Sequence, residues 1–464
     1  MCILKRTEFE GRRIAVVGIA RTGLAAAPVL RDLGASVLLS DMASDETLGE
    51  RAAEARELGV DVRTRATPED SLAGADLVVP APGIPADSPL LRLAVRLGIP
   101  VLSEIEVAYR IARAPILAVT GTNGKTTTTM WLGAMLEADG RRAWVAGNVA
   151  ADEVKQPLVT AAYRAEPGDA IVAEISSFQL EWVERFRPKI GVLTNITPDH
   201  QNRHRTMAEY VACKARLFAA QGPDDWAVVN AVNAHARKIG ASVASRLVWF
   251  DRGNCLSDDS ACVRDGWLTV CHRGEEHRLC RTEELRLPGA HNVENGLAAA
   301  AAAIVFGARP EAVARALREF GPVAHRMEPV AVVDGVRYIN NSMCTNVDAA
   351  IRSIEAVDGP VVVIAGGSSK DADFTPLGSV LARRAKRTVL IGQAADQIEA
   401  AARAVGYTEI DRAESLEAAV DLARRAARPG DTVMLSPACA SFGMFRDFEE
   451  RGSAFRSIVQ GLGR

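Results

Sequence analysis

The sequence has no long hydrophobic run, no close pair of cysteines and no excess of positive charge. Its 464 residues include 55 lysines and arginines and 58 acidic residues, for a formal net charge of −3 at pH 7. This balance predicts no nucleic-acid partner, because nucleic-acid-binding proteins carry a basic surface. The longest apolar run, residues 297–306, is too short to cross a bilayer, and the first residues lack the apolar core of a signal peptide. We therefore expect a cytoplasmic protein that does not bind membranes.

The eight cysteines are scattered along the chain, and none forms a Cys-x-x-Cys pair. This spacing is typical of reduced thiols and not of a disulfide framework. Four cysteines and two histidines fall close together in the sequence: Cys255, Cys262, Cys271, Cys280, His272 and His277. The gaps between these cysteines, six to eight residues, are wrong for a zinc knuckle, so we expect no zinc site.

The clearest motif is residues 116–129, Ile-Leu-Ala-Val-Thr-Gly-Thr-Asn-Gly-Lys-Thr-Thr-Thr-Thr. It predicts a buried strand, a glycine-rich turn and the start of a helix, whose backbone N–H groups face the phosphates of a nucleotide. Lys125 is expected to reach the terminal phosphates, and the Thr126 hydroxyl is expected to hold Mg²⁺. The strict P-loop pattern has a glycine at Val119, so Gly121 takes over the turn. The motif predicts ATP binding, and an ordinary glycine-rich turn is the alternative.

A second nucleotide-binding unit is predicted near the N-terminus. Residues 13–18 read as a strand, residues 18–23 as a glycine-containing turn into a helix, and residues 36–40 as a second strand that ends at Asp41. This is a βαβ unit with an acidic residue after its second strand. Ala20 stands where a dinucleotide fingerprint has its middle glycine and would crowd a pyrophosphate. The motif predicts either nucleotide binding of some kind or a plain doubly wound domain.

Strand and helix patterns alternate to the C-terminus, and the chain is too long for a single core. We predict a three-domain α/β protein, with short hairpins inserted at a sheet edge. The domains are an N-terminal Rossmann-like domain at 1–112 for a nucleotide sugar, a central P-loop ATPase-like domain with a mostly parallel sheet at 113–322, and a C-terminal Rossmann-like domain at 323–464 for an amino acid. Polar residues follow the predicted strands in each domain. Ligands of parallel sheets bind at those strand ends, so an active site where three such edges face one another is the economical prediction.

Several strings resemble the Mur ligase family of peptidoglycan synthesis. They lie at residues 120–128, 174–180, 195–200, 210–218, 289–295, 325–326, 342–346, 366–370 and 436–441. The strings Ser-Ser-Phe-Gln-Leu and Ser-Pro-Ala-Cys-Ala-Ser are similar to those of the glutamate-adding ligases of the family. The Asp-Asn-Pro-Arg string of the diamino-acid-adding ligases is absent. The resemblance extends over all three predicted domains in order.

The resemblance implies a monomeric, ATP-dependent ligase for cytoplasmic peptidoglycan precursors. It implies that UDP-N-acetylmuramoyl-L-alanine is activated as an acyl phosphate and joined to glutamate, with the D form favoured over the L form. The implied cofactors are ATP, two Mg²⁺ ions and a CO₂-derived carbamate on a lysine. The implied catalytic residues are Lys125, Glu174, His200 and Lys214. The implied metal ligands are Thr126, Glu174, His200 and, as a carbamate, Lys214.

The resemblance also implies three sets of binding residues. The set for ATP is Gly121, Thr122, Asn123, Gly124, Lys125, Thr126, Thr127, Asn292, Asn295, Arg326 and Asn341. The set for the nucleotide sugar is Thr22, Asp41, Pro82, Gly83, Asn148, Ser176 and Gln179. The set for glutamate is Thr345, Lys370, Ser441 and Phe448.

Four positions depart from the family's usual pattern. Asn341 and Met343 stand in place of the acid and the lysine of an Asp-Ser-Lys string, and Asn202 and Gly443 each stand in place of an acid. Losing an acid and a lysine together conserves charge, so a compensated site and a differently tuned enzyme are both open. The other functions left open are a folylpolyglutamate synthetase-like ligase, a nicotinamide-dependent oxidoreductase and a non-catalytic nucleotide-sugar sensor.

Overall fold

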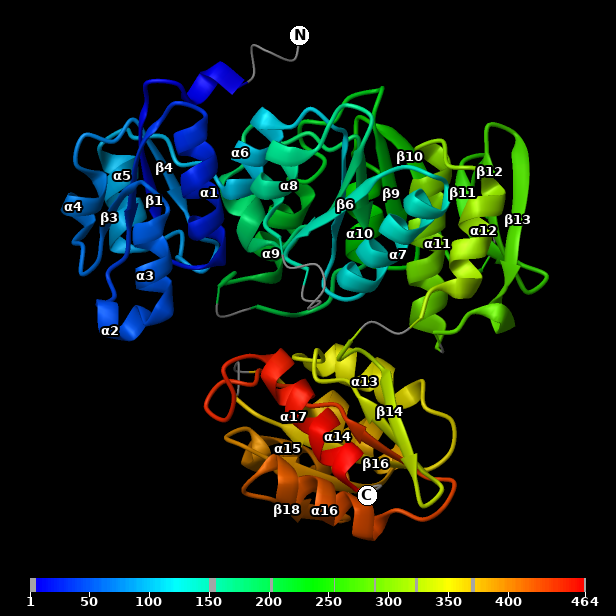
Figure 1. Cartoon of the computed structure of the whole chain (residues 1–464). Coiled ribbons are helices and arrows are strands. Elements are labelled where there is room, and N and C mark those ends of the chain that lie inside the picture. Colours follow the sequence, from blue (N-terminus) through cyan, green and yellow to red (C-terminus); the bar gives the residue numbers. More distant parts are fainter. Residues whose placement is uncertain are drawn as a thin grey trace. The chain divides into compact units, whose positions relative to one another are not determined.

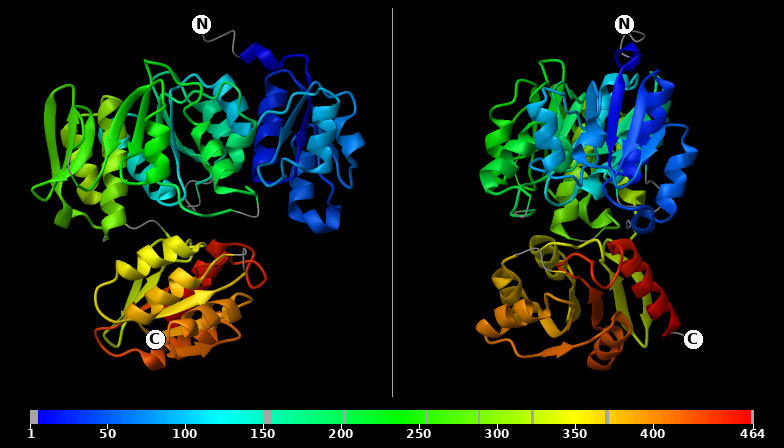
Figure 2. Two further views of the ribbon diagram at one scale, coloured as in Figure 1. Left: turned by 180° about the vertical axis from the view of Figure 1, so that it is seen from behind. Right: turned by 90° about the vertical axis from the view of Figure 1, so that its left-hand side faces the viewer.

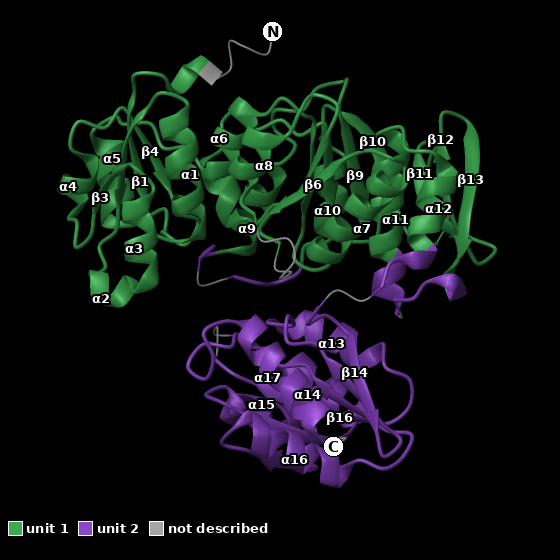
Figure 3. Cartoon of the chain, viewed as in Figure 1, with its two compact units in different colours: residues 1–196, 206–282, 294–317 green, residues 197–205, 283–293, 318–464 purple. Residues whose placement is uncertain are grey.

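The structure is a computed structural model of the chain and describes residues 6–149, 156–200, 203–253, 255–287, 289–321, 324–368 and 372–462. These residues form alternating strands and helices around three sheets (Figure 1). Contacts between residues divide the chain into two compact units (Figure 3). The first unit holds residues 1–196, 206–282 and 294–317, and the second holds residues 197–205, 283–293 and 318–464. Within the described residues, no helix combines the length and the apolar character that crossing a membrane requires.

The N-terminal sheet of the first unit has four parallel strands, in the order β3 (Asp61–Arg63), β2 (Ser36–Ser40), β1 (Arg13–Val17) and β4 (Leu77–Pro80). The apolar residues of β1 are all buried, as expected for a central strand. After β1 the chain enters α1 (Arg21–Asp32) and returns as β2, which confirms the predicted βαβ unit. The other helical segments here are η1 (Arg6–Phe9), α2 (Asp45–Leu48), α3 (Glu50–Glu57), α4 (Pro68–Leu72), α5 (Pro89–Arg96) and α6 (Glu104–Ile111).

The larger sheet of the first unit has nine strands. Their order is β13 (Glu275–Arg281), β12 (Trp267–His272), β11 (Ser260–Arg264), β10 (Arg246–Phe250), β9 (Trp226–Asn230), β8 (Ile190–Leu193), β5 (Ile116–Thr120), β7 (Ala170–Glu174) and β6 (Ala143–Gly147). The strands from β11 to β6 are parallel, while β12 and β13 pair as antiparallel hairpins at one edge. The predicted mostly parallel sheet with an edge insertion is therefore confirmed. The helical segments of this part of the chain are α7 (Lys125–Ala138), α8 (Leu158–Arg164), η2 (Phe178–Trp182), α9 (Met207–Ala215), α10 (Ala234–Gly240), η3 (Thr282–Glu284), α11 (Ala290–Val305) and α12 (Pro310–Glu319). The division into units assigns residues 283–293, with the start of α11, and residues from 318 onward to the second unit.

One hydrophobic core links the two sheets of the first unit. It contains Leu30 of α1, Ala108 of α6, Ala118 of β5 and Ala161 of α8, all of them fully buried. Helices from the N-terminal part thus pack directly on helices of the larger sheet. This shared core explains why contacts join the two parts into one unit. The predicted domain boundaries near residues 112 and 322 stay predictions.

The second unit is built on a six-stranded sheet. Its order is β14 (Glu328–Val333), β15 (Val336–Asn340), β19 (Thr432–Leu435), β16 (Val361–Gly366), β17 (Ala385–Ile391) and β18 (Ile410–Arg412), with only β14 antiparallel to its neighbour. Side chains of β16 alternate between two cores, with Val363 in one and Ile364 in the other. Helices α13 (Val347–Glu355), α14 (Thr375–Arg384) and α15 (Ala395–Ala404) cover one face, and α16 (Leu416–Ala426) and α17 (Phe448–Gly461) cover the other (Figure 2).

The edge hairpins of the first unit hold a disulfide between Cys255 and Cys262. The prediction of reduced thiols is wrong for this pair. Cys255 precedes β11 and Cys262 lies within it, and the chain folds back so that the two Cα atoms are 5.2 Å apart, within the range that a disulfide bridges. The free cysteines of the described residues are Cys213, Cys271, Cys280, Cys344 and Cys439.

Candidate active site

The predicted phosphate loop joins β5 to α7. Both glycines of the loop have positive φ, +149° at Gly121 and +84° at Gly124. A Cβ atom at Gly121 would lie 1.9 Å from Thr194 Oγ1, and one at Gly124 would lie 2.2 Å from Asn295 Oδ1, so only glycine fits either position. No side chain caps α7, and its first turn has no acidic residue. The turn thus has the form expected of a helix start that faces an anion.

The proposed metal ligands Thr126 and Glu174 lie together. Strand β7 pairs with β5 so that Glu174 is opposite Val119, which places the carboxylate beside the loop. Glu174 is 2% exposed, and its Oε2 accepts a 2.7 Å hydrogen bond from Thr126 Oγ1. Asn148 Nδ2 donates to the other carboxylate oxygen at 3.4 Å. A hydroxyl and a buried carboxylate are oxygen ligands of the kind that Mg²⁺ takes beside a polyphosphate, so the residues fit this ion.

Lys214 lies at the base of the same loop. It comes from α9 and is 1% exposed. Its Nζ donates to the Gly121 carbonyl at 2.7 Å and to Thr120 Oγ1 at 3.5 Å, and it lies 4.8 Å from the centre of the Tyr210 ring. Lys125 Nζ donates to the Thr122 carbonyl at 2.8 Å. Two predicted catalytic lysines therefore contact the backbone of the phosphate loop.

The predicted adenine residues follow one another on α11. Asn292 and Asn295 are one turn apart and both are buried. Asn295 Oδ1 accepts a 3.4 Å hydrogen bond from Thr128 Oγ1 in α7. This contact explains why Asn295 stands so close to Gly124. Its amide helps to shape the loop, and its role toward adenine stays a prediction.

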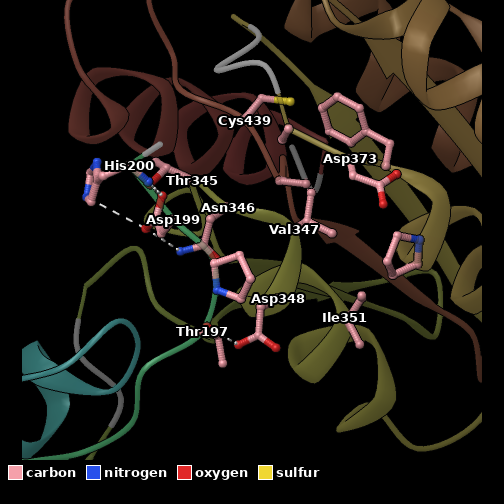
Figure 4. Close-up of a pocket in the computed structure, with 15 residues that line it drawn as sticks. Thr197, Asp199, His200, Thr345, Asn346, Val347, Asp348, Ile351, Asp373 and Cys439 are labelled. Carbon is pink, nitrogen blue, oxygen red and sulfur yellow. Dashed lines mark hydrogen bonds and ion pairs between the residues drawn. The ribbon is translucent and has the colours of Figure 1, made fainter. Parts of the chain in front are cut away.

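His200 belongs to the second unit, where it lines a pocket of about 390 Å³ (Figure 4). Two hydrogen bonds hold the segment before it to the start of α13. Thr197 Oγ1 donates to Asp348 Oδ2, and Asn346 Nδ2 donates to Asp199 Oδ2, both at 3.3 Å. The predicted glutamate ligand Thr345 lines the same pocket. His200 is thus grouped with the glutamate residues, while Glu174 belongs to the first unit.

The other predicted glutamate residues follow strands of the second unit. Ser441 is buried after β19. Phe448 begins α17, and its carbonyl accepts a 2.7 Å hydrogen bond from Ser342 Oγ. Lys370 lies outside the described residues. The structure therefore places Ser441, Phe448 and Thr345 at the strand-end side of one sheet.

The predicted nucleotide-sugar residues occupy two places in the first unit. Asp41 accepts hydrogen bonds from the backbone N–H groups of Ile19 at 2.8 Å and Ala43 at 2.9 Å, so it fixes the loop before α1. Ser176 donates to Gln179 Oε1 at 2.9 Å, just before η2. Thr22 lies in the first turn of α1, and Pro82 and Gly83 follow β4. All these residues stand at ends of strands or starts of helices, where α/β proteins bind ligands.

Comparisons with known proteins identify the family. The UDP-N-acetylmuramoylalanine--D-glutamate ligase of Pelotomaculum thermopropionicum is 46% identical over 455 residues, which cover 98% of this chain and 99% of that protein. The protein of the same name from Thermoanaerobacter pseudethanolicus is 41% identical over 98% of this chain and 100% of its own length. The chain belongs to the Mur ligase family.

Three domain models of the Mur ligase family match the chain in order between residues 12 and 439. The MurD-like N-terminal domain matches residues 12–103, the Mur ligase middle domain residues 119–303, and the Mur ligase glutamate ligase domain residues 325–439. The solved UDP-N-acetylmuramate-alanine ligase of Thermotoga maritima has the same fold, with a TM-score of 0.62 at 20% identity over 97% of this chain and 99% of that one. The predicted family and the predicted fold are therefore confirmed.

The structure describes two of the departures from the usual Mur ligase pattern at residue level. Gly443 has a φ of +91°, a conformation that a carboxylate-bearing residue adopts only with strain. Met343, which stands where the family has a lysine, contacts Arg326, with 3.9 Å between its sulfur and the guanidinium Nη1. Asn202 lies outside the described residues.

Asn341 is buried within this Mur ligase's second unit. Its Nδ2 donates to Ser353 Oγ at 2.9 Å, and its Oδ1 accepts from the Met327 N–H at 3.2 Å. An aspartate here would leave the Ser353 hydroxyl to reorient as a donor, whereas asparagine supplies a donor directly. The Asn341 amide therefore links Ser353 to the backbone at Met327 within the second unit. Its contact with ATP stays a prediction.

The sequence does not mark Glu104 as unusual, because an acidic residue at the start of a helix is common. It is buried, and its Oε1 accepts a 2.5 Å hydrogen bond from the Val159 N–H at the start of α8. Burial is the main cause that raises the pKa of this carboxyl to about 7, although the Val159 N–H and the Arg21 charge oppose the rise. Such an environment could be found only once the packing of α6 against α8 was known.

We expect Glu104→Gln to stabilise the protein more at pH 8 than at pH 5. Because the pKa of Glu104 in the folded protein lies above its ordinary value of 4.5, ionisation of this carboxyl destabilises the folded protein. The destabilisation is absent below pH 4.5 and reaches its full size above about pH 7. The shift corresponds to about 3 kcal/mol at most, and glutamine keeps an oxygen for Val159. Denaturant unfolding of both proteins at the two pH values measures the difference. Glu57→Gln, at an exposed site on α3, is the control, and an equal effect of Glu104→Gln at both pH values would contradict this assignment.

Proposed function

We propose that this chain is an ATP-dependent ligase that joins glutamate to UDP-N-acetylmuramoyl-L-alanine. The observation that carries the proposal is the glycine-constrained phosphate loop with Thr126 and Glu174 hydrogen-bonded beside it. The relatives named for this reaction support it, since they align with 98% of the chain. They favour glutamate ligation over the oxidoreductase, the folate-type ligase and the nucleotide-sugar sensor.

The first unit supplies the groups for activation of a carboxylate. A carboxylate is a poor electrophile, so amide formation requires that ATP first convert it into an acyl phosphate. Lys125 and the loop N–H groups would bind the phosphates and counter their charge. Thr126 and Glu174 would hold Mg²⁺, which when bound screens the phosphate from the attacking carboxylate. The nucleotide-sugar residues, Asp41 and its neighbours, would fix the substrate that carries this carboxylate.

The proposal includes a second Mg²⁺ at His200 and a carbamate on Lys214. Lys214 is buried against the phosphate loop, and a carbamate would convert its cation into an anionic group beside the metal site. His200 follows Asp199, whose carboxylate accepts the His200 N–H at 2.8 Å and so fixes the turn that presents the ring. These two residues would complete the charge balance for phosphoryl transfer.

The second unit would bind the amino acid. Thr345 and Ser441 offer hydroxyls to its carboxylates, Lys370 offers a cation, and Phe448 lies one helical turn from the arginine at position 451. The amine attacks the acyl phosphate, and phosphate leaves with one oxygen of the original carboxylate. Because the proposed substrates are cytoplasmic metabolites, we place the enzyme in the cytoplasm. We also expect it to act as a monomer.

We expect phosphate release from ATP only with UDP-N-acetylmuramoyl-L-alanine and glutamate together, and faster with D-glutamate than with L-glutamate. Both enantiomers carry the same charges, so preference depends on where the site positions the amine. A coupled phosphate assay at equal enantiomer concentrations measures it, with each substrate omitted in turn as the control. A preference for L-glutamate would overturn the stereochemical assignment, and release that needs no amino acid would overturn the ligase.

A further inference from the structure

Arg451 of α17 is a buried arginine whose hydrogen bonds, among the described residues, go to neutral oxygens. It is 1% exposed. Its Nε donates to Ser342 Oγ at 3.0 Å and its Nη2 to the Ser342 carbonyl at 2.8 Å. Nη1 and Nη2 both donate to the Cys439 carbonyl at 3.2 Å. The guanidinium thus bridges the segment after β15 and the segment after β19.

The charge of Arg451 has no counter-ion in the part of the chain that the structure describes. Its partners are a hydroxyl and two carbonyls, and no carboxylate there forms an ion pair with it. Burial lowers the pKa of the guanidinium to about 10, which leaves it protonated at neutral pH. Burial also raises the pKa of the neighbouring Cys344 thiol, which favours its neutral form. A buried cation without an ion-pair partner is costly, and hydrogen bonds to neutral oxygens offset only part of that cost.

The helix itself does not compensate this charge. Helix α17 begins at Phe448, so Arg451 is its fourth residue and lies close to the end where the helix dipole is positive. By contrast, Arg456 on the same helix forms an ion pair with Glu328, with nitrogen–oxygen distances of 2.8 and 3.1 Å. Within one helix, therefore, one arginine is paired and the other is not.

Arg451 also lies close to a third segment that follows a strand of the same sheet. A Cβ atom at Gly367 would lie 3.2 Å from Arg451 Nη1, so the guanidinium also lies against the segment after β16. The three segments that it contacts lead to three proposed glutamate residues: Ser342 precedes Thr345, Cys439 precedes Ser441, and Gly367 precedes Lys370. A single buried cation thus lies against the described part of all three segments, at Ser342, Cys439 and Gly367.

We propose that Arg451 is a positioning residue that holds these three segments together and supplies positive potential for the dicarboxylate of the incoming amino acid. This inference rests on the proposed function. The charge does not touch glutamate. It acts through the backbone of the three segments and through a low-dielectric interior, where electrostatic attraction is stronger than in water.

Two substitutions separate charge from hydrogen bonding. Arg451→Gln removes the charge but keeps a donor for the buried carbonyls, whereas Arg451→Lys keeps the charge but loses the planar fork. We expect Arg451→Gln to raise the KM for glutamate about tenfold or more, and Arg451→Lys to raise it less than about threefold. The KM for ATP should change less than about twofold in both. Arg456→Gln, which removes a paired charge from the same helix, is the matched control and should leave the KM for glutamate unchanged.

The test measures phosphate release at varied glutamate concentration, together with the melting temperature of each variant. These measurements distinguish an electrostatic role of Arg451 from a purely structural one. Equal KM values for the lysine and glutamine variants, or losses that follow melting temperature alone, would assign Arg451 a purely structural role and overturn the inference. If the glutamine variant does not fold, the lysine variant decides: a KM within about threefold of the parent supports the inference, and any larger rise overturns it. A parent enzyme that does not use glutamate would instead overturn the proposed function.

Discussion

Replacing Glu174 with alanine should lower phosphate release by at least about a hundredfold, the scale typical of a group that stabilises charge in the transition state. The carboxylate is buried at the end of β7 and hydrogen-bonded to Thr126, so no other group of that strand can replace it. The variant should also need more Mg²⁺ for half-maximal rate. Initial rates at increasing Mg²⁺ measure both effects.

The matched control for Glu174→Ala is Glu166→Ala, which removes an exposed carboxylate that pairs with Arg113 in the same unit. This control should keep the parental rate. Circular dichroism and melting temperature confirm that both variants are folded. Near-parental activity of Glu174→Ala at saturating Mg²⁺ would show that the metal assignment is wrong.

Lys214→Ala should be nearly inactive and should regain part of its activity with acetate. A carbamate on Lys214 would contribute an anionic group, and a small carboxylate that diffuses into the vacated space can take its place. An alkylamine should not restore activity, because it would bring the opposite charge. Lys238→Ala, at an exposed site on α10, is the control and should behave as the parent with and without acetate.

The two rescue agents make the Lys214 prediction specific. In the structure Nζ donates to the Gly121 carbonyl, a contact that an unmodified ammonium also makes. Rescue by an alkylamine would therefore assign Lys214 a cationic role and contradict the carbamate. Mass spectrometry of the intact protein under bicarbonate does not replace this experiment, because a carbamate is labile.

The sequence predicted the phosphate loop and its surroundings because local and global signals agree there. The apolar run of β5, the two glycines and the residues that begin α7 together favour the same strand, turn and helix start. The strand-end positions of Asp41, Glu174 and Thr345 followed from the alternation of strands and helices, since parallel strands present their carboxyl ends at one edge.

Other features depend on contacts that no local pattern encodes. The burial of Arg451 arises from segments after three different strands, and on a sequence it is one more arginine of a surface helix. The raised pKa of Glu104 depends on the packing of α6 against α8. The Cys255–Cys262 disulfide depends on how the chain folds back before β11, and the spacing of seven positions is not a disulfide signal by itself.

The most direct test of the ligase mechanism follows an oxygen atom. UDP-N-acetylmuramoyl-L-alanine labelled with ¹⁸O in its alanyl carboxylate is incubated with the enzyme, ATP, Mg²⁺ and D-glutamate, and the released phosphate is analysed by mass spectrometry. If the carboxylate attacks the γ-phosphorus and the amine then displaces phosphate, one ¹⁸O atom should appear in phosphate for each amide bond formed. Phosphate without ¹⁸O, in the presence of amide product, would contradict the acyl-phosphate mechanism, and no D-glutamate-dependent product would contradict the ligase itself.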